Sequence, residues 1–416
     1  MNLFKTFKRH LKKYYTDDLK KLYKFVIPKG NSSLFIKPGN KLRTSKKFDY
    51  LIADNCIGDI EDIQNFFVKL RAIIKPDGKL IITYYNYLWE PVLKFASYIG
   101  LRKRVSEQNW LDNDDISNLL SLSGFEVITR KKRLLIPFNI PFVTNILNKV
   151  IAHLPLINHL CLTIYVIARP VNNSIDKYSV SIIVPARNEA GNIPRIVKQI
   201  PQFGISQEII FVEGHSNDQT WEKIQIEVNK KRNKKITVKG FKQSGKGKAD
   251  AVRLGFKKAT GQMLMIYDAD MTVDAKDLIK FYDAIANGSG EFANGTRLVY
   301  PMEKEAMQTL NKFFNKLFSV IFSWILGQRF KDTLCGTKVI LKNNYNRILK
   351  LPKLFGKDPF GDFDLIFGAV RLNLKVVEIP VRYRERKYGS TNISRFRHGV
   401  QLARMTWLAF NQFMAW

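Results

Sequence analysis

The chain contains 416 residues, too many for one ordinary hydrophobic core, so we expect two domains. A hydrophobic fraction of 45% with 12% aromatic residues excludes an intrinsically disordered chain. The formal net charge of +32 indicates an anionic partner, which could be nucleic acid, an acidic membrane surface or a phosphorylated substrate.

The N-terminal residues 1–25 are basic and lack the apolar core of a secretory signal peptide. Leu3, Phe7 and Leu11 recur at a four-residue spacing between lysines and arginines, which predicts an amphipathic helix. Such a helix would lie either on a membrane surface or on its own domain. Three cysteines match no disulfide or metal spacing, which suits a reducing cytoplasm: Cys56, Cys161 and Cys335.

Three apolar segments are too broken or too short for us to predict a membrane-spanning helix. They are residues 134–168, which contain three prolines, residues 313–326 and residues 400–416. Each can be explained by core packing or by a helix lying in the membrane interface. For the last two we favour the interface, because basic residues stand beside their aromatic side chains. We therefore expect a protein peripheral to the cytoplasmic face of a membrane.

The first domain, residues 1–170, contains one β-α-β unit with its turn chemistry in place. A strand over Phe48–Asp54 precedes a helical pattern over 60–74, the turn Lys75-Pro76-Asp77-Gly78, and a strand over 79–84. This order resembles the second half of a class I S-adenosylmethionine-dependent methyltransferase. The resemblance implies a partial Rossmann-like domain, with strands near 125–128 and 164–167 as its last two.

The part of that family's fold that binds the cofactor is missing. Between Pro28 and Lys47 there is no G-x-G loop and no room for two further β-α units of roughly 30 residues each. Without a glycine loop over a helix N-terminus, the cofactor's methionine and ribose would have no binding site. We therefore expect a truncated, inactive methyltransferase-like domain that binds no S-adenosylmethionine.

A polar break, Arg169-Pro170-Val171-Asn172-Asn173-Ser174, precedes a second domain that we place at residues 178–398. Strands and helices then alternate as in a parallel sheet. The predicted strands are 180–184, 208–212, 235–239 and 263–266, and helices are predicted to end near Ile200, Lys230 and Ala259. The last residues, 399–416, form a separate amphipathic segment.

Polar loops follow each of these strands, so we expect them to meet at one edge of the sheet. Pro185, Arg187 and Glu189 follow the first strand, and Glu213 and Ser216 follow the second. These side chains suit a nucleoside's base and ribose, although Ser216 can also simply cap a helix. The loop Gln243-Ser244-Gly245-Lys246-Gly247-Lys248 opens a helix and suits a diphosphate, but it lacks the Walker spacing.

The strand over 263–266 runs into Tyr267-Asp268-Ala269-Asp270. Alternation along a strand would aim Asp268 and Asp270 the same way, and paired carboxylates suit Mg²⁺ or Mn²⁺ beside substrate phosphates. Taken alone, the pattern is also typical of a solvated loop with helix-capping aspartates. The neighbouring loops favour the metal site.

This ordered set of motifs resembles family 2 glycosyltransferases, and within them the dolichyl- or polyprenyl-phosphate mannose and glucose synthases. The motifs are Pro-Ala-Arg-Asn-Glu-Ala, Ser-Asn-Asp-Gln-Thr, the Gly-Lys-Gly loop and Asp-Ala-Asp. The resemblance implies a GT-A nucleotide-diphospho-sugar transferase fold with a mostly parallel sheet. It also implies that Asp268 and Asp270 hold the metal on the donor diphosphate. Glu213-Gly214 departs from the family's usual Asp-Asp, which leaves the identity of the nucleotide open.

Further matches to that family lie downstream. Arg297 follows Gly295-Thr296, and Asp332 to Lys338 resembles the family's Asp-x-x-x-Gly motif near the acceptor. The segment from Arg384 and Arg386 to Thr391 resembles a loop that in relatives covers the donor and acceptor phosphates. Its alternative explanation is a solvated basic face. The predicted ligands of the acceptor phosphate are Arg297, Lys338, Arg384, Arg386 and Thr391.

An inverting displacement at the anomeric carbon needs a nucleophile and a stabilised leaving group. We expect the metal and Lys246 to neutralise the nucleotide diphosphate. A lipid monophosphate is already anionic, since its second pKa is about 6, so the abundant arginines favour polyprenyl phosphate as the acceptor. Asp332 is the first candidate for an acceptor-side carboxylate, and Asp364 is the second.

The predicted protein is thus a metal-dependent enzyme that moves a hexose from a nucleotide-diphosphate sugar to a lipid phosphate. Alternatives are a bifunctional methyltransferase–glycosyltransferase, a non-catalytic scaffold and a basic nucleic-acid-binding protein. No nucleic-acid-binding motif accompanies the charge, so we expect no nucleic-acid partner.

Overall fold

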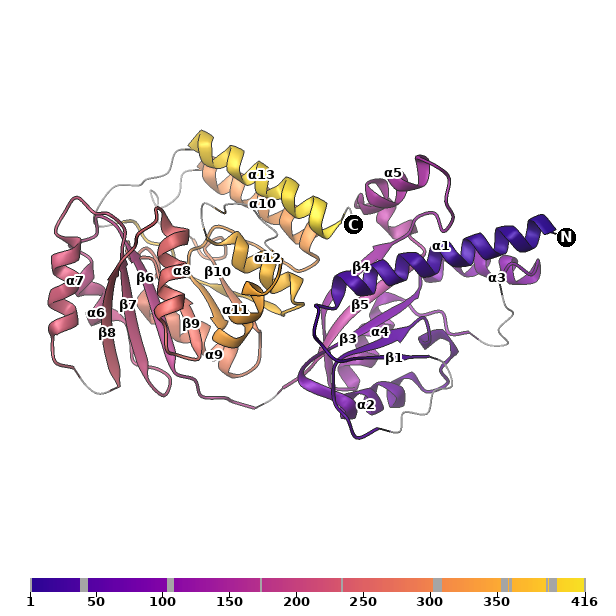
Figure 1. The fold of residues 1–416 in the computed structure, drawn as a ribbon, viewed down its shortest axis with the longest axis horizontal. Helices are drawn as coiled ribbons and strands as arrows, with labels where there is room; N and C mark the ends of the chain where they lie inside the picture. Colours follow the sequence, from indigo (N-terminus) through magenta and orange to yellow (C-terminus); the bar gives the residue numbers. More distant parts are fainter. Residues whose placement is uncertain are drawn as a thin grey trace. The chain divides into compact units, whose positions relative to one another are not determined.

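The computed structural model describes residues 2–37, 44–102, 108–172, 174–232, 235–301, 309–352, 358, 361–386, 388 and 395–414. It separates into two compact units (Figure 1). The first unit comprises Met1–Asn172 with Asn411–Trp416, and the second comprises Asn173–Phe410. No helix in the described part of the chain is both long and apolar enough to cross a membrane.

The first unit is built on a five-stranded sheet in the order β1-β2-β3-β5-β4. β1, β2 and β3 pair in parallel, whereas β5 lies antiparallel between β3 and β4. The strands are β1 (Ser33–Ile36), β2 (Phe48–Asp54), β3 (Ile74–Tyr85), β4 (Phe125–Arg133) and β5 (Thr163–Pro170). The helices are α1 (Asn2–Val26), α2 (Ile63–Ile73), α3 (Glu90–Tyr98), α4 (Asn113–Leu122) and α5 (Val143–Lys149).

Helices cover both faces of this sheet, because successive side chains of a strand point to opposite faces and apolar residues occur on both. α2 and α4 pack on one face against residues such as Leu51 and Leu80. The C-terminal half of α1 packs on the other face, where Leu22 meets Ile52 and Ile81. The predicted N-terminal helix is therefore confirmed, and its second half lies on its own domain.

The predicted turn at Lys75-Pro76-Asp77-Gly78 differs from the structure, because β3 begins before it, at Ile74. Phe48 pairs with Ile74, while Tyr50 already pairs with Lys79, so the turn residues bulge out within the ladder. A side chain at Gly78 would come within 2.7 Å of Ile74 and 3.1 Å of the Asp49 carbonyl. The proline–glycine signal therefore marks a bulge rather than the end of an element.

The second unit is built on a seven-stranded sheet in the order β12-β10-β11-β9-β6-β7-β8. β11 is the one described strand of this sheet that runs antiparallel to its neighbours, so the expected mostly parallel α/β sheet, which is GT-A-like, is confirmed. The strands are β6 (Val180–Ala186), β7 (Gln207–Glu213), β8 (Ile236–Lys242), β9 (Met263–Ile266), β10 (Phe292–Thr296), β11 (Lys338–Leu341) and β12 (Val376–Pro380).

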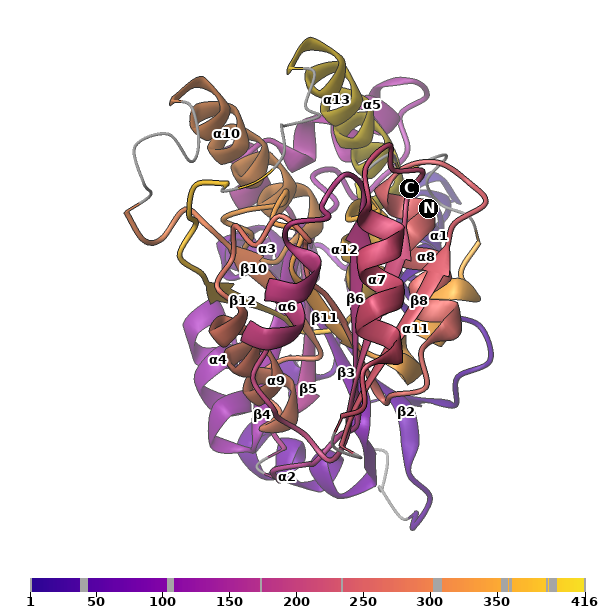
Figure 2. The ribbon, with the colours of Figure 1, turned by 90° about the vertical axis from the view of Figure 1, so that its left-hand side faces the viewer.

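Helices lie on both faces of this sheet as well. Residues such as Ile182 and Phe211 point into a core covered by α6, α7 and α9, and Figure 2 shows α6 and α7 side by side on that face. Ile183 points the other way, against Gly255 of α8. The helices are α6 (Ile193–Gln199), α7 (Thr220–Asn229), α8 (Lys248–Lys258), α9 (Leu278–Ala286), α10 (Thr309–Leu326), α11 (Lys342–Leu349), α12 (Phe363–Arg371) and α13 (Arg395–Phe413).

Candidate active site at the carboxyl edge of the second sheet

Hydrogen bonds join the loops that follow β6 and β7. The backbone N–H of Asn188 donates to Ser216 Oγ at 3.0 Å, and that of Glu189 donates to Thr220 Oγ1 at 2.9 Å. The carboxylate of Glu213, at the end of β7, accepts from the backbone N–H of Ser216. The segment after β7 is thus bound both to the loop after β6 and to the end of β7. The expectation that these polar loops meet at one edge is confirmed for these two.

The glycine-rich loop before α8 joins the same edge. His215 Nε2 lies 2.8 Å from the carbonyl oxygen of Gly245. Gly247 precedes the first residue of α8 with φ = 87°, a left-handed conformation that glycine adopts without steric cost. This turn leaves Lys246 exposed and brings Lys248 Nζ to 2.6 Å from Asp268 Oδ1. The sequence predicted lysines in this loop but selected Lys246 as the site residue, so the pairing of Lys248 with Asp268 was not predicted.

Asp268 lies in a strongly positive environment. Burial favours its neutral form, but the Coulombic attraction of Lys248, and then of Lys338 and Arg297, holds the pKa of Asp268 below its ordinary value. Gly336 packs directly against it, since a Cβ at Gly336 would lie 1.9 Å from Asp268 Oδ2. The glycine of the Asp-x-x-x-Gly motif therefore makes room for the Asp268 carboxylate.

Asp270 faces a different cation from Asp268. Its Oδ1 accepts from the Thr272 hydroxyl at 2.9 Å, and its Oδ2 accepts from Arg386 Nη2 at 2.9 Å. β9 ends at Ile266, so both aspartates lie in the turn beyond it, and strand alternation does not set their directions. Each carboxylate instead takes its direction from a cation supplied by another segment.

Arg386 also joins Asp270 to the loop after β6. Arg386 Nη1 lies 3.6 Å from Glu189 Oε1, and Glu189 Oε2 accepts from Asn192 Nδ2 at 2.7 Å. Burial, opposed in part by Asn192 and Arg386, raises the pKa of Glu189 to about 7. Three predicted site residues, Glu189, Asp270 and Arg386, are thus brought together in one ion-paired group.

The segment that carries Arg386 lies beside the Asp-x-Asp turn. Tyr383 forms an antiparallel bridge with Val273, and the N–H of Arg384 donates to the Thr272 carbonyl at 2.9 Å. Arg384 Nη2 then donates to Asp274 Oδ2 at 2.7 Å, at the protein surface. Thr391, predicted for the same loop, lies outside the described residues.

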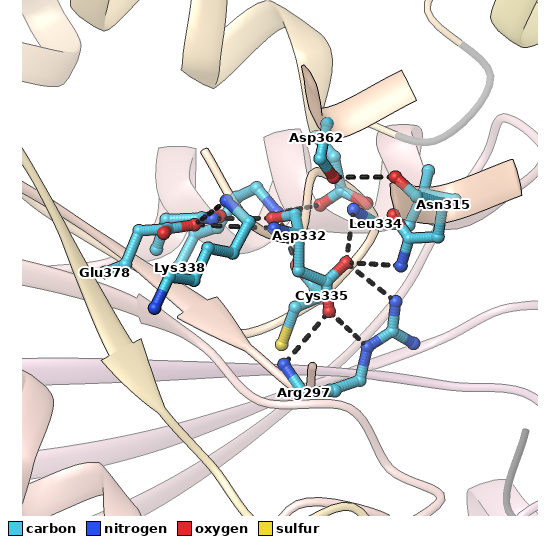
Figure 3. A network of polar contacts seen from close by, with 11 residues as sticks. Arg297, Asn315, Asp332, Leu334, Cys335, Lys338, Asp362 and Glu378 are labelled. Carbon is cyan, nitrogen blue, oxygen red and sulfur yellow. Dashed lines mark hydrogen bonds and ion pairs between the residues drawn. The ribbon is translucent and has the colours of Figure 1, made fainter. Parts of the chain in front are cut away.

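A closed polar network surrounds Asp332 (Figure 3). Its carboxylate accepts two side-chain hydrogen bonds from Arg297, at 2.7 and 2.9 Å, and one from Asn315 Nδ2 at 2.9 Å. The backbone N–H groups of Arg297 and Leu334 complete the set. Asp332 is fully buried, and the balance of burial against Arg297 lowers its pKa to about 2. This carboxylate is ionised and fully occupied by donors.

The other two predicted residues of this region also have internal partners. Lys338 is almost completely buried, with Nζ 3.2 Å from Asp362 Oδ1 and a hydrogen bond to the Cys335 carbonyl. Asp364, at the start of α12, lies 3.3 Å from Arg253 Nη1 and keeps about a third of its side chain exposed. Burial and the neighbouring Asp358 raise the pKa of Asp364 to about 6.

The remaining predicted residues of the donor side lie on β6 and its loop. Pro185 is half-buried within β6, opposite Val212, and Arg187 is exposed where the loop begins. Both therefore stand at the carboxyl edge beside Glu189.

The donor set suits a divalent cation shared with a substrate. Among the residues that the structure describes, no group of three or more His, Cys, Asp or Glu could hold a metal ion by itself. Magnesium, however, commonly binds through one or two carboxylates, with substrate phosphates and water as its other ligands. Asp268 and Asp270 fit that pattern, because their direct ion-pair partners, Lys248 and Arg386, are long side chains that could turn toward a substrate's phosphates.

The mostly parallel sheet, the joined loops and this pair of carboxylates are the features that the sequence resemblance implies for a glycosyltransferase site. In agreement, residues 181–348 match the model of the family "Glycosyl transferase family 2". The protein is a glycosyltransferase, and its family 2 domain lies in the second unit.

Curated relatives point to the same class. The chain is 24% identical over 246 residues to a dolichyl-phosphate beta-glucosyltransferase of Dictyostelium discoideum, covering 56% of this chain and 74% of that protein. It is 28% identical over 203 residues to a dolichol-phosphate mannosyltransferase of Pyrococcus furiosus, covering 42% of this chain and 56% of that protein. It is 27% identical to glycosyltransferase AglJ of Haloferax volcanii, covering 53% and 68%.

Similarity to a solved structure is weaker. Glucosyl-3-phosphoglycerate synthase of Mycobacterium tuberculosis, in a complex with Mn²⁺ and uridine diphosphate, gives a TM-score of 0.41 at 13% identity. The match covers 56% of this chain and 80% of that one. This similarity is too low to assign the metal or the nucleotide of that complex to this protein.

Proposed function

We propose that the protein transfers a hexose, with inversion, from a nucleotide-diphosphate sugar to a polyprenyl phosphate, in a reaction that requires Mg²⁺ or Mn²⁺. The observation that carries this proposal is the pairing of two loop carboxylates, Asp268 and Asp270, with the cations Lys248 and Arg386. The curated relatives whose names include dolichyl or dolichol phosphate support the acceptor.

On the donor side, neighbouring carboxylates and lysines suit a nucleotide diphosphate that carries a divalent cation. Asp268 and Asp270 would hold the cation, which when bound would neutralise charge on the departing diphosphate. Lys248 would then turn from Asp268 to the phosphate oxygens, since an ammonium is a mobile point charge. Lys246, which is exposed, would reach the phosphates from solvent. Arg187, Glu189, Glu213 and Ser216 would contact the nucleoside at the joined loops.

On the acceptor side, an already anionic phosphate needs positioning more than deprotonation. Arg386 would exchange its bond to Asp270 for the acceptor phosphate, because a guanidinium fork matches phosphate oxygens. Arg384 and Thr391 would extend that contact. Lys338 would not contact the phosphate, since its ammonium is buried against Asp362. It would act by the Coulombic attraction that lowers the pKa of Asp268.

The two predicted carboxylates would have different roles. Asp332 is fully engaged by Arg297 and its neighbours, so we propose that it positions Arg297 rather than accepting a proton. Asp364 is part-exposed with a pKa of about 6, so it is the better candidate for a carboxylate facing the acceptor. Such a pKa suits proton exchange with a phosphate whose own second pKa is about 6.

The acceptor would be reached at the cytoplasmic face of a membrane. Helices α10 and α13 are in contact in the second unit, where the ring centroids of Trp324 and Phe410 lie 6.1 Å apart. Their outer sides expose Phe313, Val320 and Trp407, while Phe322 and Leu402 are buried. Such half-buried helices with exposed aromatic side chains suit a membrane interface.

For the first unit we propose a truncated methyltransferase-like fold without cofactor binding. Its strands β4 and β5 include residues 125–128 and 164–167, which the resemblance implies are the last two strands, and β5 lies antiparallel between β3 and β4. At the carboxyl ends of β2 and β3, Tyr23 OH donates to Asp54 at 2.8 Å and Tyr15 OH donates to Asn55 at 3.0 Å. Helix α1 thereby fills the edge at which a cofactor would bind.

The direct test is a donor screen on the full chain. Nucleotide-diphosphate sugars are incubated with polyprenyl phosphate and Mg²⁺ or Mn²⁺, and products are read by mass spectrometry. We expect one hexosyl-phosphoryl-polyprenol that disappears with a chelator. Transfer to a lipid alcohol but not to the lipid phosphate would overturn the acceptor, and full turnover in chelator would overturn the metal.

A further inference from the structure

The first unit carries an exposed apolar surface that the proposed chemistry leaves unexplained. Three segments contribute to it: the N-terminal part of α1 (residues 4–13), residues 87–102 around α3, and residues 138–160 around α5. Leu156 is 87% exposed, Phe142 is 85% exposed and Tyr98 is 75% exposed. Phe7, Phe95 and Ile146 are also exposed. We name this set of segments the apolar surface.

Direct contacts show that the three segments are neighbours. The rings of Phe7 and Phe138 lie 6.4 Å apart, which joins α1 to the third segment. Lys8 Nζ donates to the Gly100 carbonyl at 2.6 Å, which joins α1 to the end of α3. Trp89 Nε1 donates to the Leu160 carbonyl at 2.7 Å, which joins the second and third segments. In Figure 1, α3 lies beside the N-terminal end of α1.

Helix α1 is longer than its packing requires. Its C-terminal half buries Leu19, Leu22 and Val26 against the sheet, whereas every described side chain from Phe4 to His10 is exposed. At a rise of about 1.5 Å per residue, the first three turns extend roughly 15 Å beyond the buried part. A soluble helix would ordinarily be polar there, yet Phe4 and Phe7 continue the apolar stripe.

The charge of the apolar surface is predominantly positive. Residues 4–13, 87–102 and 138–160 contain five, two and one Lys or Arg, and Glu90 is their one acidic residue. Glu90 is already paired with Lys94. The basic residues of α1 that lie beside its phenylalanines are Lys5, Lys8, Arg9, Lys12 and Lys13. Phe, Tyr and Trp surrounded by uncompensated cations match the headgroup region of an anionic bilayer.

The third segment suits a position on the bilayer rather than across it. Pro141 and Pro155 interrupt it, and its one α-helix, α5, is seven residues long. The described chain contains no helix that could span a membrane. Short helices with exposed Leu and Phe can enter only the interfacial region, where loop carbonyls still reach water.

We infer that the apolar surface docks the first unit onto an anionic membrane, so that this unit is a membrane-binding module. The partner is the bilayer surface itself. Apolar side chains would enter the headgroup region, and the α1 cations would contact lipid phosphates. This inference does not depend on the proposed transfer reaction, because binding to vesicles is measured without any sugar transfer.

The test is co-sedimentation of the full chain with vesicles of phosphatidylcholine, either alone or mixed with phosphatidylglycerol. We expect binding to the mixed vesicles that weakens with added salt. The double variant Phe142→Ser/Leu156→Ser should bind at least about tenfold more weakly. The matched control Ile205→Ser/Ile226→Ser removes two exposed side chains of the second unit and should bind like the unmodified protein.

Charge is tested separately on α1. Lys5→Glu/Arg9→Glu should lose at least about tenfold in affinity for mixed vesicles, since each basic residue near such a surface contributes on the order of 1 kcal/mol. Lys257→Glu/Lys276→Glu is the matched control at exposed lysines of the second unit. Circular dichroism and transfer to a detergent-dispersed acceptor should be unchanged in all four variants.

Three outcomes would overturn the inference. One is the absence of vesicle binding by the unmodified chain. Another is equal loss of binding in the control variants. The third is concentration-dependent self-association that the Phe142→Ser/Leu156→Ser variant abolishes, which would identify a second copy of the chain as the partner. If transfer fails while vesicle binding follows the expected pattern, the proposed function fails and the docking surface stands.

Discussion

The carboxyl edges of the two sheets differ in what fills them. In the first unit, Tyr15 and Tyr23 of α1 reach Asn55 and Asp54, so the edge is closed by the chain itself. In the second unit, hydrogen-bonded loops surround Asp268 and Asp270, and the groups opposite these carboxylates are long cationic side chains.

We propose that this difference lets the second edge bind a ligand and prevents binding at the first. Tyr15 and Tyr23 are held by the part of α1 that packs on the sheet, and burial raises their pKa values, which keeps them as neutral donors. Lysine and arginine side chains can instead rotate toward a ligand's phosphates. The first edge therefore stabilises the fold, whereas the second can exchange internal ion pairs for ligand contacts.

The largest expected effect is a loss of transferase activity at the carboxyl edge of the second sheet. Asp268→Asn or Asp270→Asn should lower transferase activity by on the order of 100-fold to 1,000-fold, because charge stabilisation at the leaving group supplies several kcal/mol. The measurement is glycolipid formation under saturating donor. Asp283→Asn, at an exposed aspartate on α9, is the matched control and should retain activity. Full activity in Asp270→Asn would remove that residue from the site.

Asp332 should matter for stability more than for proton transfer. Asp332→Ala leaves Arg297 buried without its partner, which should cost about 3–5 kcal/mol of unfolding free energy. Replacing both residues with apolar ones of similar size, Arg297→Met/Asp332→Leu, should recover much of that loss. Chemical denaturation of the full chain measures both values. A variant at Asp332 that keeps its stability but loses proton-dependent turnover would instead make this residue a catalytic base.

At the carboxyl edge of the first sheet, a conservative substitution should lower stability only slightly. Tyr23→Phe removes the hydroxyl that donates to Asp54, so we expect a loss on the order of 1 kcal/mol with transferase activity unchanged. Thermal unfolding and the glycolipid assay provide the readouts, with the exposed Tyr87→Phe as control. Loss of activity at unchanged stability would connect the first edge to catalysis.

The last prediction concerns the dependence of stability on pH. The folded-state pKa of Glu189, about 7, lies above its ordinary value of 4.5, so the folded protein holds an extra proton between these values. Its stability relative to Glu189→Gln should therefore fall as the pH rises from about 5 to about 8. Thermal unfolding of both proteins across this range measures the difference. A constant difference would show that Glu189 is ionised throughout.

Much of the second unit was predictable because its signals are local. Apolar runs such as Ile182–Val184 and Met263–Ile266 gave strands, and polar residues at their ends gave the loops. The antiparallel β11 was not predicted, since Lys338–Leu341 resembles any short buried strand and direction depends on partners far along the chain. In the first unit, periodicity predicted α1 but could not show that its tyrosines fill the sheet edge.

Within the candidate site, residue types were easier to predict than partners. The Gly-Lys-Gly-Lys loop indicated cations near a phosphate, but only the turn at Gly247 decides that Lys248, and not Lys246, meets Asp268. Arg297 and Asp332 were each predicted as functional groups. Their bidentate pairing joins residues 35 positions apart, and no local pattern predicts such a contact.

The comparison of the two edges is tested most directly by isothermal titration of the full chain. Nucleoside diphosphates with Mg²⁺ and, in parallel, S-adenosylmethionine are the ligands, with Asp268→Asn as the matched variant. We predict that at least one nucleoside diphosphate binds the unmodified chain, that Asp268→Asn weakens this binding at least about tenfold, and that S-adenosylmethionine gives no heat of binding. Micromolar binding of S-adenosylmethionine, with no nucleoside diphosphate bound, would contradict the account.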